Sequence, residues 1–354
     1  MAKEHSDWEK VISFGNLLHG LKMAQRNVMW KDSVCSYSMQ ALENTLKLRQ
    51  ELLDGTYEIS KYQLFMIHEP KTRQIVATRI RDRQFQRSLC DNALYRDMTK
   101  GFIHDNCACQ RGKGVDFALN RMEAHLHRYY RKHGNKGWVL RCDIRHYFPE
   151  TPHEVAKAAI RKRVRDPKCA EAAETIVDSF GGDRGIGLGS QVSQLVELAV
   201  LDETDHFIKE RLRIKHYIRY MDDFILIHED RKVLENAKDE ITKRVNALGL
   251  EMNRKTQIAP LKNGIRFLKW HFILTDTGKV IRRMSRQSVV KERRKLKKLA
   301  AKVKAGQIPI EYLWLSFQSW RANASRGNTH KTVWNMEQLY NKLKEDIEHG
   351  TENG

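Results

Sequence analysis

The sequence predicts an α+β protein in which helical segments are interspersed with short strands. Apolar residues recur at helical spacing over residues 8–55, 81–98, 115–133, 153–180, 190–213 and 231–249. Short β-type runs lie between them, and two of these, 215–218 and 224–227, flank a tight turn as the strands of a hairpin do. The 354 residues carry 64 Lys and Arg against 44 Asp and Glu, a net charge of +20. A surplus of this size favours a polyanionic partner such as nucleic acid.

The N-terminal part is predicted to be helical up to Gly55, a residue that suits the end of a helix. Tyr57–Ile67 and Gln74–Ile80 then form a predicted hairpin, and its turn carries Lys71 and Arg73. A further strand is expected at 138–142, where the apolar run WVLRC ends at an acid. Strands are also predicted at 264–274 and 279–283.

The composition changes near the C-terminal end. Residues 282–304 hold 11 Lys or Arg and a single acid, Glu292. A solvated helix face usually mixes charges of both signs, so we expect this segment to be a helix that faces nucleic acid. The tail, 311–345, is predicted to be helical, and its spaced aromatic residues are expected to lie in a core; they include Trp314, Trp320, Trp334 and Tyr340.

The strongest chemical signal is the turn Tyr220-Met221-Asp222-Asp223. Adjacent carboxylates repel each other and lose hydration together, an arrangement that a divalent cation would stabilise. An Asp-Asp turn also occurs where Asp merely bonds its own backbone. Asp143 adds a third acid at the end of the run 138–142. Two strands that bring carboxylates to one end of a sheet predict a two-Mg²⁺ site for phosphoryl transfer.

Other classes of protein are disfavoured. No run of ~18 apolar residues occurs, so we expect no membrane span. The polar N-terminus shows no secretory signal. Six cysteines without paired ligand spacing predict reduced thiols rather than a disulfide framework or a zinc site. Together these features favour a cytoplasmic protein.

Seven segments, in their order along the chain, resemble the motifs of reverse transcriptases over about residues 30–345. They are Ile75–Leu94 (fingers), Arg111–Gly114, Asp143–Phe148 (motif A), Leu188–Gln194 (motif B), Tyr220–Asp223 (motif C), Leu250–Thr256 (motif D) and Phe267–Trp270 (motif E). The resemblance implies a right-hand polymerase fold of fingers, palm and thumb, with an antiparallel palm sheet and a helical, basic thumb. The expected division is 1–55 (N-terminal helical extension), 56–135 (fingers), 136–284 (palm) and 285–354 (thumb and helical tail).

The same resemblance implies a role for each matching residue. Two Mg²⁺ ions, for which Mn²⁺ is an expected substitute, would be held by Asp143, Asp222, Asp223 and the carbonyl of Ile144. The incoming dNTP would contact Lys71, Arg73, Gln194 and Phe148, and the Phe148 ring would exclude a ribose 2′-OH. Lys255 is the expected general acid for the pyrophosphate leaving group. Nucleic-acid contacts are expected at Arg111, Lys113, Tyr220, Arg293, Lys297 and Lys298.

Two positions depart from the usual motifs. Motif B here is Leu188-Gly189-x-x-x-Ser193-Gln194, whereas retroviral and group II intron enzymes usually carry Gln-Gly-x-x-x-Ser-Pro. This form resembles the reverse transcriptases of diversity-generating retroelements, in which the missing Gln is associated with error-prone copying. Lys269 stands where a motif E primer grip often has Gly.

The function implied is an RNA-directed DNA polymerase that makes cDNA, as the error-prone enzyme of a bacterial or phage diversity-generating retroelement. An alternative is the reverse transcriptase of an antiphage defence system copying a non-coding RNA. Two non-enzymatic alternatives are a catalytically silent RNA-binding protein of the same fold and an unrelated basic RNA-binding module. Expected partners are a non-coding or element-encoded template RNA, a DNA primer, dNTPs, and an accessory protein or a second copy. We expect a polymerase core without RNase H, integrase or HNH domains.

Overall fold

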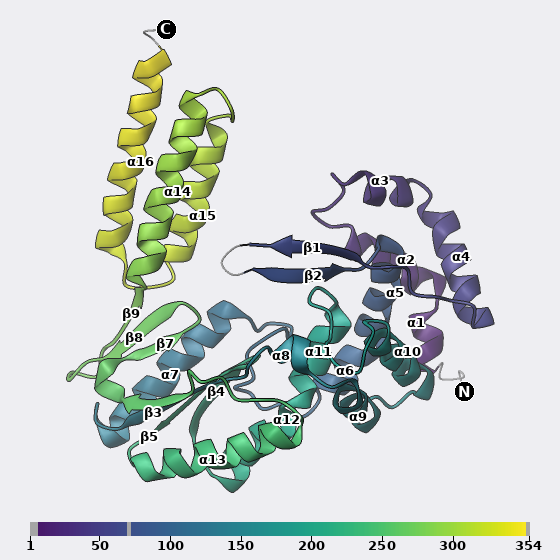
Figure 1. Cartoon of the computed structure of the whole chain (residues 1–354), viewed down its shortest axis with the longest axis horizontal. Helices are drawn as coiled ribbons and strands as arrows, with labels where there is room; N and C mark the ends of the chain where they lie inside the picture. Colours follow the sequence, from purple (N-terminus) through teal and green to yellow (C-terminus); the bar gives the residue numbers. More distant parts are fainter. Residues whose placement is uncertain (1–5, 69–71, 352–354) are drawn as a thin grey trace.

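The computed structural model describes residues 6–68 and 72–351, and it confirms the predicted α+β class. Helices surround three antiparallel sheets, of two, four and three strands. Figure 1 shows α14, α15 and α16 side by side as a bundle beyond the three-stranded sheet, with the hairpin β1–β2 projecting toward them. This is the right-hand arrangement of palm, fingers and thumb.

The N-terminal helices are α1 (Asp7–Val11), α2 (Phe14–Ala24), α3 (Asp32–Met39) and α4 (Ala41–Asp54). Gly55 ends α4 in the left-handed conformation, at φ +71°, as its place in the sequence predicts. The hairpin β1 (Gln63–Ile67) and β2 (Arg73–Ala77) follows, with Ile67 opposite Arg73. Its first strand is shorter than the predicted 57–67, because Tyr57 and Ser60 instead bond the buried carboxylate of Asp82. Lys71 lies outside the described residues.

The chain then forms a second set of helices and enters the palm. These helices are α5 (Ile80–Leu89), the π-helix η1 (Cys90–Leu94), α6 (Tyr95–Thr99) and α7 (Val115–His133). After the first palm strand, β3 (Trp138–Asp143), come α8 (Tyr147–Glu150), α9 (His153–Arg163), α10 (Pro167–Asp178), α11 (Gln191–Val200), α12 (Asp202–His206) and the π-helix η2 (Phe207–Arg211).

The four-stranded palm sheet has the order β4-β5-β3-β6, with every pair antiparallel. Its strands are β3, β4 (His216–Tyr220), β5 (Asp223–His228) and β6 (Gln257–Pro260), and α13 (Arg231–Ala247) connects β5 to the segment before β6. Side chains alternate between two buried clusters, since Leu140 and Leu226 enter one and Val139 and Ile227 the other. The first cluster contains residues of α11 and α13, and the second contains residues of α7. Helices therefore cover both faces of the sheet, and its turn-bearing end carries the acids.

The C-terminal part confirms the strand predicted at 279–283, whereas the run predicted at 264–274 is divided by a turn into two strands. After the short 3₁₀-helix η3 (Leu261–Asn263), the three-stranded sheet comprises β7 (Ile265–Phe267), β8 (Trp270–Leu274) and β9 (Val280–Met284). Leu268 and Lys269 form the two-residue turn between β7 and β8, with φ of +48° and +70°. Lys269 thus adopts the left-handed backbone for which glycine is best suited, at the position where a primer grip often has Gly.

The thumb helices are α14 (Arg286–Lys304), α15 (Glu311–Ala324) and α16 (His330–Thr351). The basic helix starts later than predicted, because Arg282 and Arg283 belong to β9. The prediction of a core position is right for Trp320, which is buried, but wrong for Trp314 and Trp334, which are 50% and 60% exposed. The three helices bury one stripe each, and these two rings lie outside it. Among the described residues, no helix combines the length and the apolar character needed to cross a membrane.

Candidate active site

The hairpin β4–β5 brings the predicted acids together. Tyr220 pairs with Asp223, so Met221 and Asp222 form a two-residue turn. The β3–β5 ladder then sets Asp143 directly opposite Asp223. Directly opposed residues of an antiparallel pair project to the same face, about 4.5–5.5 Å apart at Cβ. The structure therefore places Asp143 and Asp223 as neighbours at the sheet end that carries Asp222.

Electrostatics at this end favour a bound cation. Burial raises the pKa of Asp223 to about 7; the charge and the hydrogen bond of Arg141 oppose this shift, while Asp143 and Asp222 add to it. The Arg141 Nε lies 3.3 Å from Asp223 Oδ1. The Arg141 guanidinium pairs with Asp223, and its single charge leaves the three acids with a surplus of negative charge, which is the condition that a divalent cation relieves.

The donor set fits Mg²⁺, although it forms no complete cage. Among the described residues, no group of three or more His, Cys, Asp or Glu side chains is arranged to hold a metal ion. Mg²⁺ prefers oxygen ligands and usually takes only one or two carboxylates, completing its shell with water and substrate phosphates. Aspartates alone, two of them opposed across a ladder, match that requirement.

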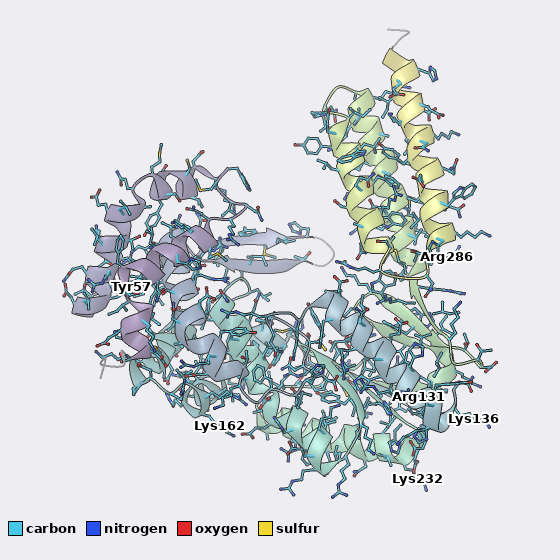
Figure 2. All side chains as sticks on the ribbon, turned by 180° about the vertical axis from the view of Figure 1, so that it is seen from behind. Tyr57, Arg131, Lys136, Lys162, Lys232 and Arg286 are labelled. Atoms are coloured by element: carbon cyan, nitrogen blue, oxygen red, sulfur yellow. The ribbon has the colours of Figure 1, made fainter. Side chains whose placement is uncertain are left out.

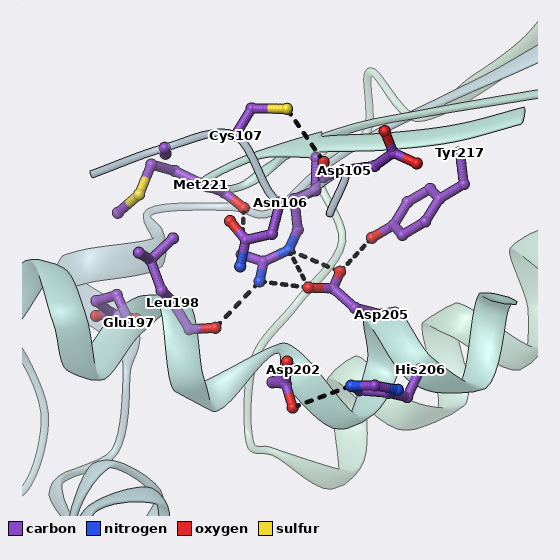
Figure 3. A network of polar contacts seen from close by, with 12 residues as sticks. Asp105, Asn106, Cys107, Glu197, Leu198, Asp202, Asp205, His206, Tyr217 and Met221 are labelled. Carbon is purple, nitrogen blue, oxygen red and sulfur yellow. Dashed lines mark hydrogen bonds and ion pairs between the residues drawn. The ribbon is translucent and has the colours of Figure 1, made fainter. Parts of the chain in front are cut away.

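A buried ion pair holds the backbone of the turn between β4 and β5 (Figure 3). Arg219 and Asp205 are both fully buried, and the Arg219 guanidinium donates to both carboxylate oxygens of Asp205 at 2.6–3.0 Å. The Tyr217 hydroxyl donates to the same carboxylate. Arg219 Nη1 donates to the carbonyl of Met221 at 3.0 Å, and Nη2 donates to that of Leu198. The backbone of the turn is therefore fixed to α11 and α12 through one side chain.

A buried glutamate lies near the same turn. Glu197 on α11 is completely buried, and burial together with the charge of Asp222 raises its pKa to about 8, against the hydrogen bonds of Thr151 and Tyr147. The Thr151 hydroxyl donates to Glu197 Oε2 at 3.2 Å. Its neutral form is thus favoured at neutral pH, which spares the acids of the turn a further negative charge.

The segment that carries Lys255 is tied to Asp143. The backbone N–H of Asn253 donates to the carbonyl of Asp143 at 2.7 Å, and Ile144 forms a β-bridge with Met252. Lys255 lies two residues beyond Asn253, on an exposed turn. The structure thus brings motif D beside motif A, as the predicted role of Lys255 requires.

Phe148 lies on α8, five residues after Asp143, and is half-buried. Its carbonyl accepts a hydrogen bond from the N–H of Ile186 at 2.8 Å, in the glycine-rich loop that leads to α11. In that loop Gly189, at φ +124°, leaves only 3.3 Å between an added Cβ and the carbonyl of Val76 on the fingers strand. Gln194, half-buried on the first turn of α11, follows this loop. Motifs A and B therefore meet beside the hairpin β1–β2.

The predicted nucleic-acid residues differ in their surroundings. Lys113 donates to the carbonyls of His104 and Asn106, so its ammonium is engaged within the protein. Arg111 is exposed, stacks on Tyr95 and pairs with Asp91 at 3.4 Å. Tyr220 is half-buried at the end of β4. Arg73, for which a contact with the incoming dNTP is predicted instead, begins β2. The remaining three are exposed together on α14: Arg293, Lys297 and Lys298.

Sequence reasoning missed the residues that hold the site in place. Arg219 carries the one available signal, because a charged residue at an inward position of the apolar strand HYIRY needs a buried partner. Nothing local identifies that partner as Asp205, which is on a different helix. Arg141 gives the same signal within β3, where it alternates with apolar residues.

Replacing Arg219 by Met is expected to lower the free energy of unfolding by about 3–5 kcal/mol, because it leaves the Asp205 carboxylate buried and unpaired. Arg231→Met is the matched control, since it breaks an exposed Arg–Glu pair with Glu235 of similar length and should cost only about 0–1 kcal/mol. Urea unfolding measures both. Equal losses in the two variants would contradict the role given to the buried pair.

Comparison with known proteins agrees with this geometry. The family model described as "Reverse transcriptase (RNA-dependent DNA polymerase)" matches residues 67–272, more than half of the chain. Protein YkfC of Escherichia coli (strain K12) is 24% identical over 265 residues, which cover 62% of this chain and 69% of that protein.

Solved telomerase structures are also similar. The C-terminally truncated apo telomerase of Candida tropicalis has a TM-score of 0.48 at 12% identity, and the alignment covers 68% of this chain and 60% of that one. The telomerase of Candida albicans in complex with a fragment of telomeric RNA has a TM-score of 0.48 at 10% identity. That alignment covers 80% of this chain and 58% of the telomerase chain. The chain thus spans less than two thirds of either telomerase chain. On the match over residues 67–272, the chain belongs to the reverse transcriptase family of RNA-dependent DNA polymerases.

Proposed function

We propose that the chain copies RNA into DNA at a site formed by Asp143, Asp222 and Asp223. The observation that carries this assignment is the β3–β5 register, which sets Asp143 opposite Asp223 beside the turn residue Asp222. Two Mg²⁺ ions, replaceable by Mn²⁺, would activate the attacking 3′-oxygen and stabilise the leaving oxygen when bound. The three carboxylates would hold them, with the carbonyl of Ile144.

The remaining residues of the predicted site would bind and select the incoming nucleotide and hold the template–primer. Lys71 and Arg73, which the sequence assigns to the fingers hairpin, would bind the triphosphate, because Arg makes bidentate phosphate contacts and Lys supplies a point charge. Phe148 would exclude a 2′-OH, with Gln194 nearby, and Lys255 would donate a proton to pyrophosphate. Arg111, Lys113, Tyr220 and the α14 cations would contact the template–primer. We also propose the division into N-terminal extension, fingers, palm and thumb at residues 55/56, 135/136 and 284/285.

We further propose an error-prone enzyme of the kind found in diversity-generating retroelements, acting on a separate template RNA, with an accessory protein or a second copy as partner. Leu188 supports this proposal: it stands at the position of the usual motif B glutamine and is half-buried next to Gly189, which approaches the fingers strand. An apolar side chain there offers no hydrogen bond by which a base pair is checked.

Asp222→Asn and Asp143→Asn are each expected to reduce primer extension on RNA with Mg²⁺ by at least about a hundredfold, because the metal ligands lose charge. Asp239→Asn, an exposed acid on α13, is the matched control and should keep wild-type activity. Thermal unfolding in the absence of metal should show that all three fold. Primer extension by the Asp222→Asn variant at the wild-type rate would refute the metal assignment. If the wild-type chain binds RNA but does not extend a primer, the alternative of a catalytically silent RNA-binding protein is favoured.

Phe148→Ala is expected to raise the use of ribonucleotides relative to deoxynucleotides by about tenfold or more, because the ring's contact with a 2′-OH is lost. The measurement is the ratio of kcat/KM for a dNTP and the matching NTP. Phe180→Ala, another half-buried aromatic close to the glycine-rich loop, serves as control for lost packing. If the two variants change the ratio equally, Phe148 is a packing residue.

Leu188→Gln, which restores the usual motif B residue, is expected to lower the error frequency of the cDNA several-fold, since Gln can hydrogen-bond where Leu cannot. Sequencing of cDNA made from a defined RNA template measures it. Leu42→Gln, an exposed leucine on α4, controls for the change in polarity. An unchanged error spectrum would remove the support that motif B gives to the retroelement role, and the defence alternative would then be favoured.

A further inference from the structure

A basic hollow lies at the end of the palm sheet away from the acids. Its volume is about 690 Å³, and its lining comes from the C-terminal half of α7, the residues before β4 and the end of β5. His216, which lines it, begins β4, whereas Tyr220 ends that strand opposite Asp223. Four residues of strand, at about 3.3 Å each, separate the hollow from the catalytic turn by roughly 13 Å. It is therefore distinct from the polymerase site.

The hollow has a strong surplus of positive charge. Its permanent cations are Arg128, Arg131, Lys132, Arg213 and Lys215, all exposed, and the acid in its lining is Glu229. Glu229 lies 3.7 Å from both His133 and His228. Within residues 6–68 and 72–351, none of the five cations has an ion pair or a side-chain hydrogen bond. Figure 2 shows Arg131 in the lower part of the molecule, well below Arg286 at the start of the thumb bundle.

A second charged depression of the molecule is neutralised internally. The hollow between α9 and α10 is lined by Arg161 and Arg165 but also by Glu171, Glu174 and Asp178. There Arg161 pairs with Glu174, and Arg165 pairs with Asp97 at 3.1 Å. The palm hollow thus differs from the hollow between α9 and α10 in the pairing of its cations as well as in its surplus of positive charge.

Stabilisation of the C-terminal end of α7 does not account for all of these cations. Arg131 and Lys132 lie in the last turn of α7, where cations stabilise the helix dipole. Arg213 and Lys215 belong to a different segment and converge on the same hollow. The backbone of Arg213 is left-handed, at φ +54°, a conformation that costs energy in a non-glycine residue and is often found at ligand sites.

The floor of the hollow holds a polar atom without a partner. His216 Nδ1 is buried, and no described residue forms a hydrogen bond with it. Burial, together with the nearby charges of His125, His133, Lys209 and Arg128, lowers the pKa of His216 to about 4. The imidazole is therefore neutral at neutral pH, available to hydrogen-bond a ligand beneath the ring of cations.

We propose that this hollow binds the phosphodiester backbone of an RNA helix, outside the stretch that is being copied. Three arginines provide bidentate phosphate contacts, and two converging segments match successive phosphates along a strand better than a single small anion. The contact would hold the folded part of a template RNA against the palm while its single-stranded part is copied. The binding step itself does not depend on polymerase activity, so it goes beyond the function proposed above.

The test compares two triple variants of the full-length chain. The hollow variant is Arg131→Gln/Lys132→Gln/Arg213→Gln. The control is Lys22→Gln/Lys47→Gln/Lys168→Gln, which removes three exposed charges from α2, α4 and α10. The probes are a long RNA hairpin and a short RNA template with a DNA primer that fills only the polymerase cleft. Inorganic tripolyphosphate and a polyglutamate peptide serve as competitors.

For the hairpin, the hollow variant should lose about tenfold or more in affinity, and the log–log salt slope should fall by about 2, since each phosphate contact contributes ~0.7–0.9. Binding and extension of the short template–primer should stay at the wild-type level. The thumb variant Arg293→Gln/Lys297→Gln/Lys298→Gln should instead weaken both probes.

The proposal is overturned if the control variant loses hairpin affinity equally, or if hairpin affinity does not change. It is also overturned if the hollow variant loses only tripolyphosphate binding, which would indicate a site for a small polyphosphate, or only polyglutamate binding, which would indicate an acidic protein partner. If the wild-type chain fails to extend a primer, the polymerase proposal fails, and the hairpin measurement still decides this one.

Discussion

The buried pair Arg219–Asp205 is the interaction on which the active site depends. Arg219 lies on the strand next to the catalytic turn, and its side chain enters the face of the palm sheet opposite to that of Asp143 and Asp223. One guanidinium bonds α12 through Asp205, α11 through Leu198 and the turn through Met221. Its backbone also pairs with the segment 105–107. Arg219 thus connects four parts of the chain: α11, α12, the turn and the segment 105–107.

Such a pair contributes to specificity more than to stability. Removing two charges from water costs about as much as their attraction returns, so an apolar pair of similar volume often serves stability as well. An apolar pair, however, would place no donor on the Met221 carbonyl. The hydrogen bond to that carbonyl fixes the conformation of the turn that carries the proposed metal ligands, and this accounts for a fully buried arginine in an otherwise apolar layer.

The backbone is strained at the two turns that adjoin the acids. His146, three residues after Asp143, has φ +45°, and Met221, next to Asp222, has φ +56°. Each costs of order 1–3 kcal/mol and persists only where the surroundings impose it. Met221 is held by Arg219 through its carbonyl, and the carbonyl of His146 accepts from Glu150 at 2.9 Å. Strain at two independent turns that flank the same acids is typical of a site shaped for chemistry rather than for stability.

The sequence allowed the local part of this site to be predicted, because the signals are local. Apolar runs on either side of Met221-Asp222 indicate a hairpin, and the acid that ends WVLRC indicates a second strand. Pairings between distant elements leave no such signal: Asp205 looks like any helical acid, and nothing local sets Asp143 opposite Asp223. The exposed rings of Trp314 and Trp334 show the same limit, since aromatic spacing predicts a helix face but not whether another element covers it.

The same reasoning explains why a net charge of +20 indicates a nucleic-acid partner but not where it binds. Arg121, Arg163 and Arg219 are as basic as any exposed arginine, yet each is paired with a buried acid, at Asp105, Asp202 and Asp205. The positive charge of each of these arginines is compensated by its acid partner within the fold. In the described part of the chain, Arg293, Lys297 and Lys298 on α14 and the five cations of the palm hollow have no ion pair, so their mutual repulsion is uncompensated. A polyanion would relieve that repulsion in both places, so the pairing of charges supports the two proposed nucleic-acid surfaces, which composition alone does not distinguish.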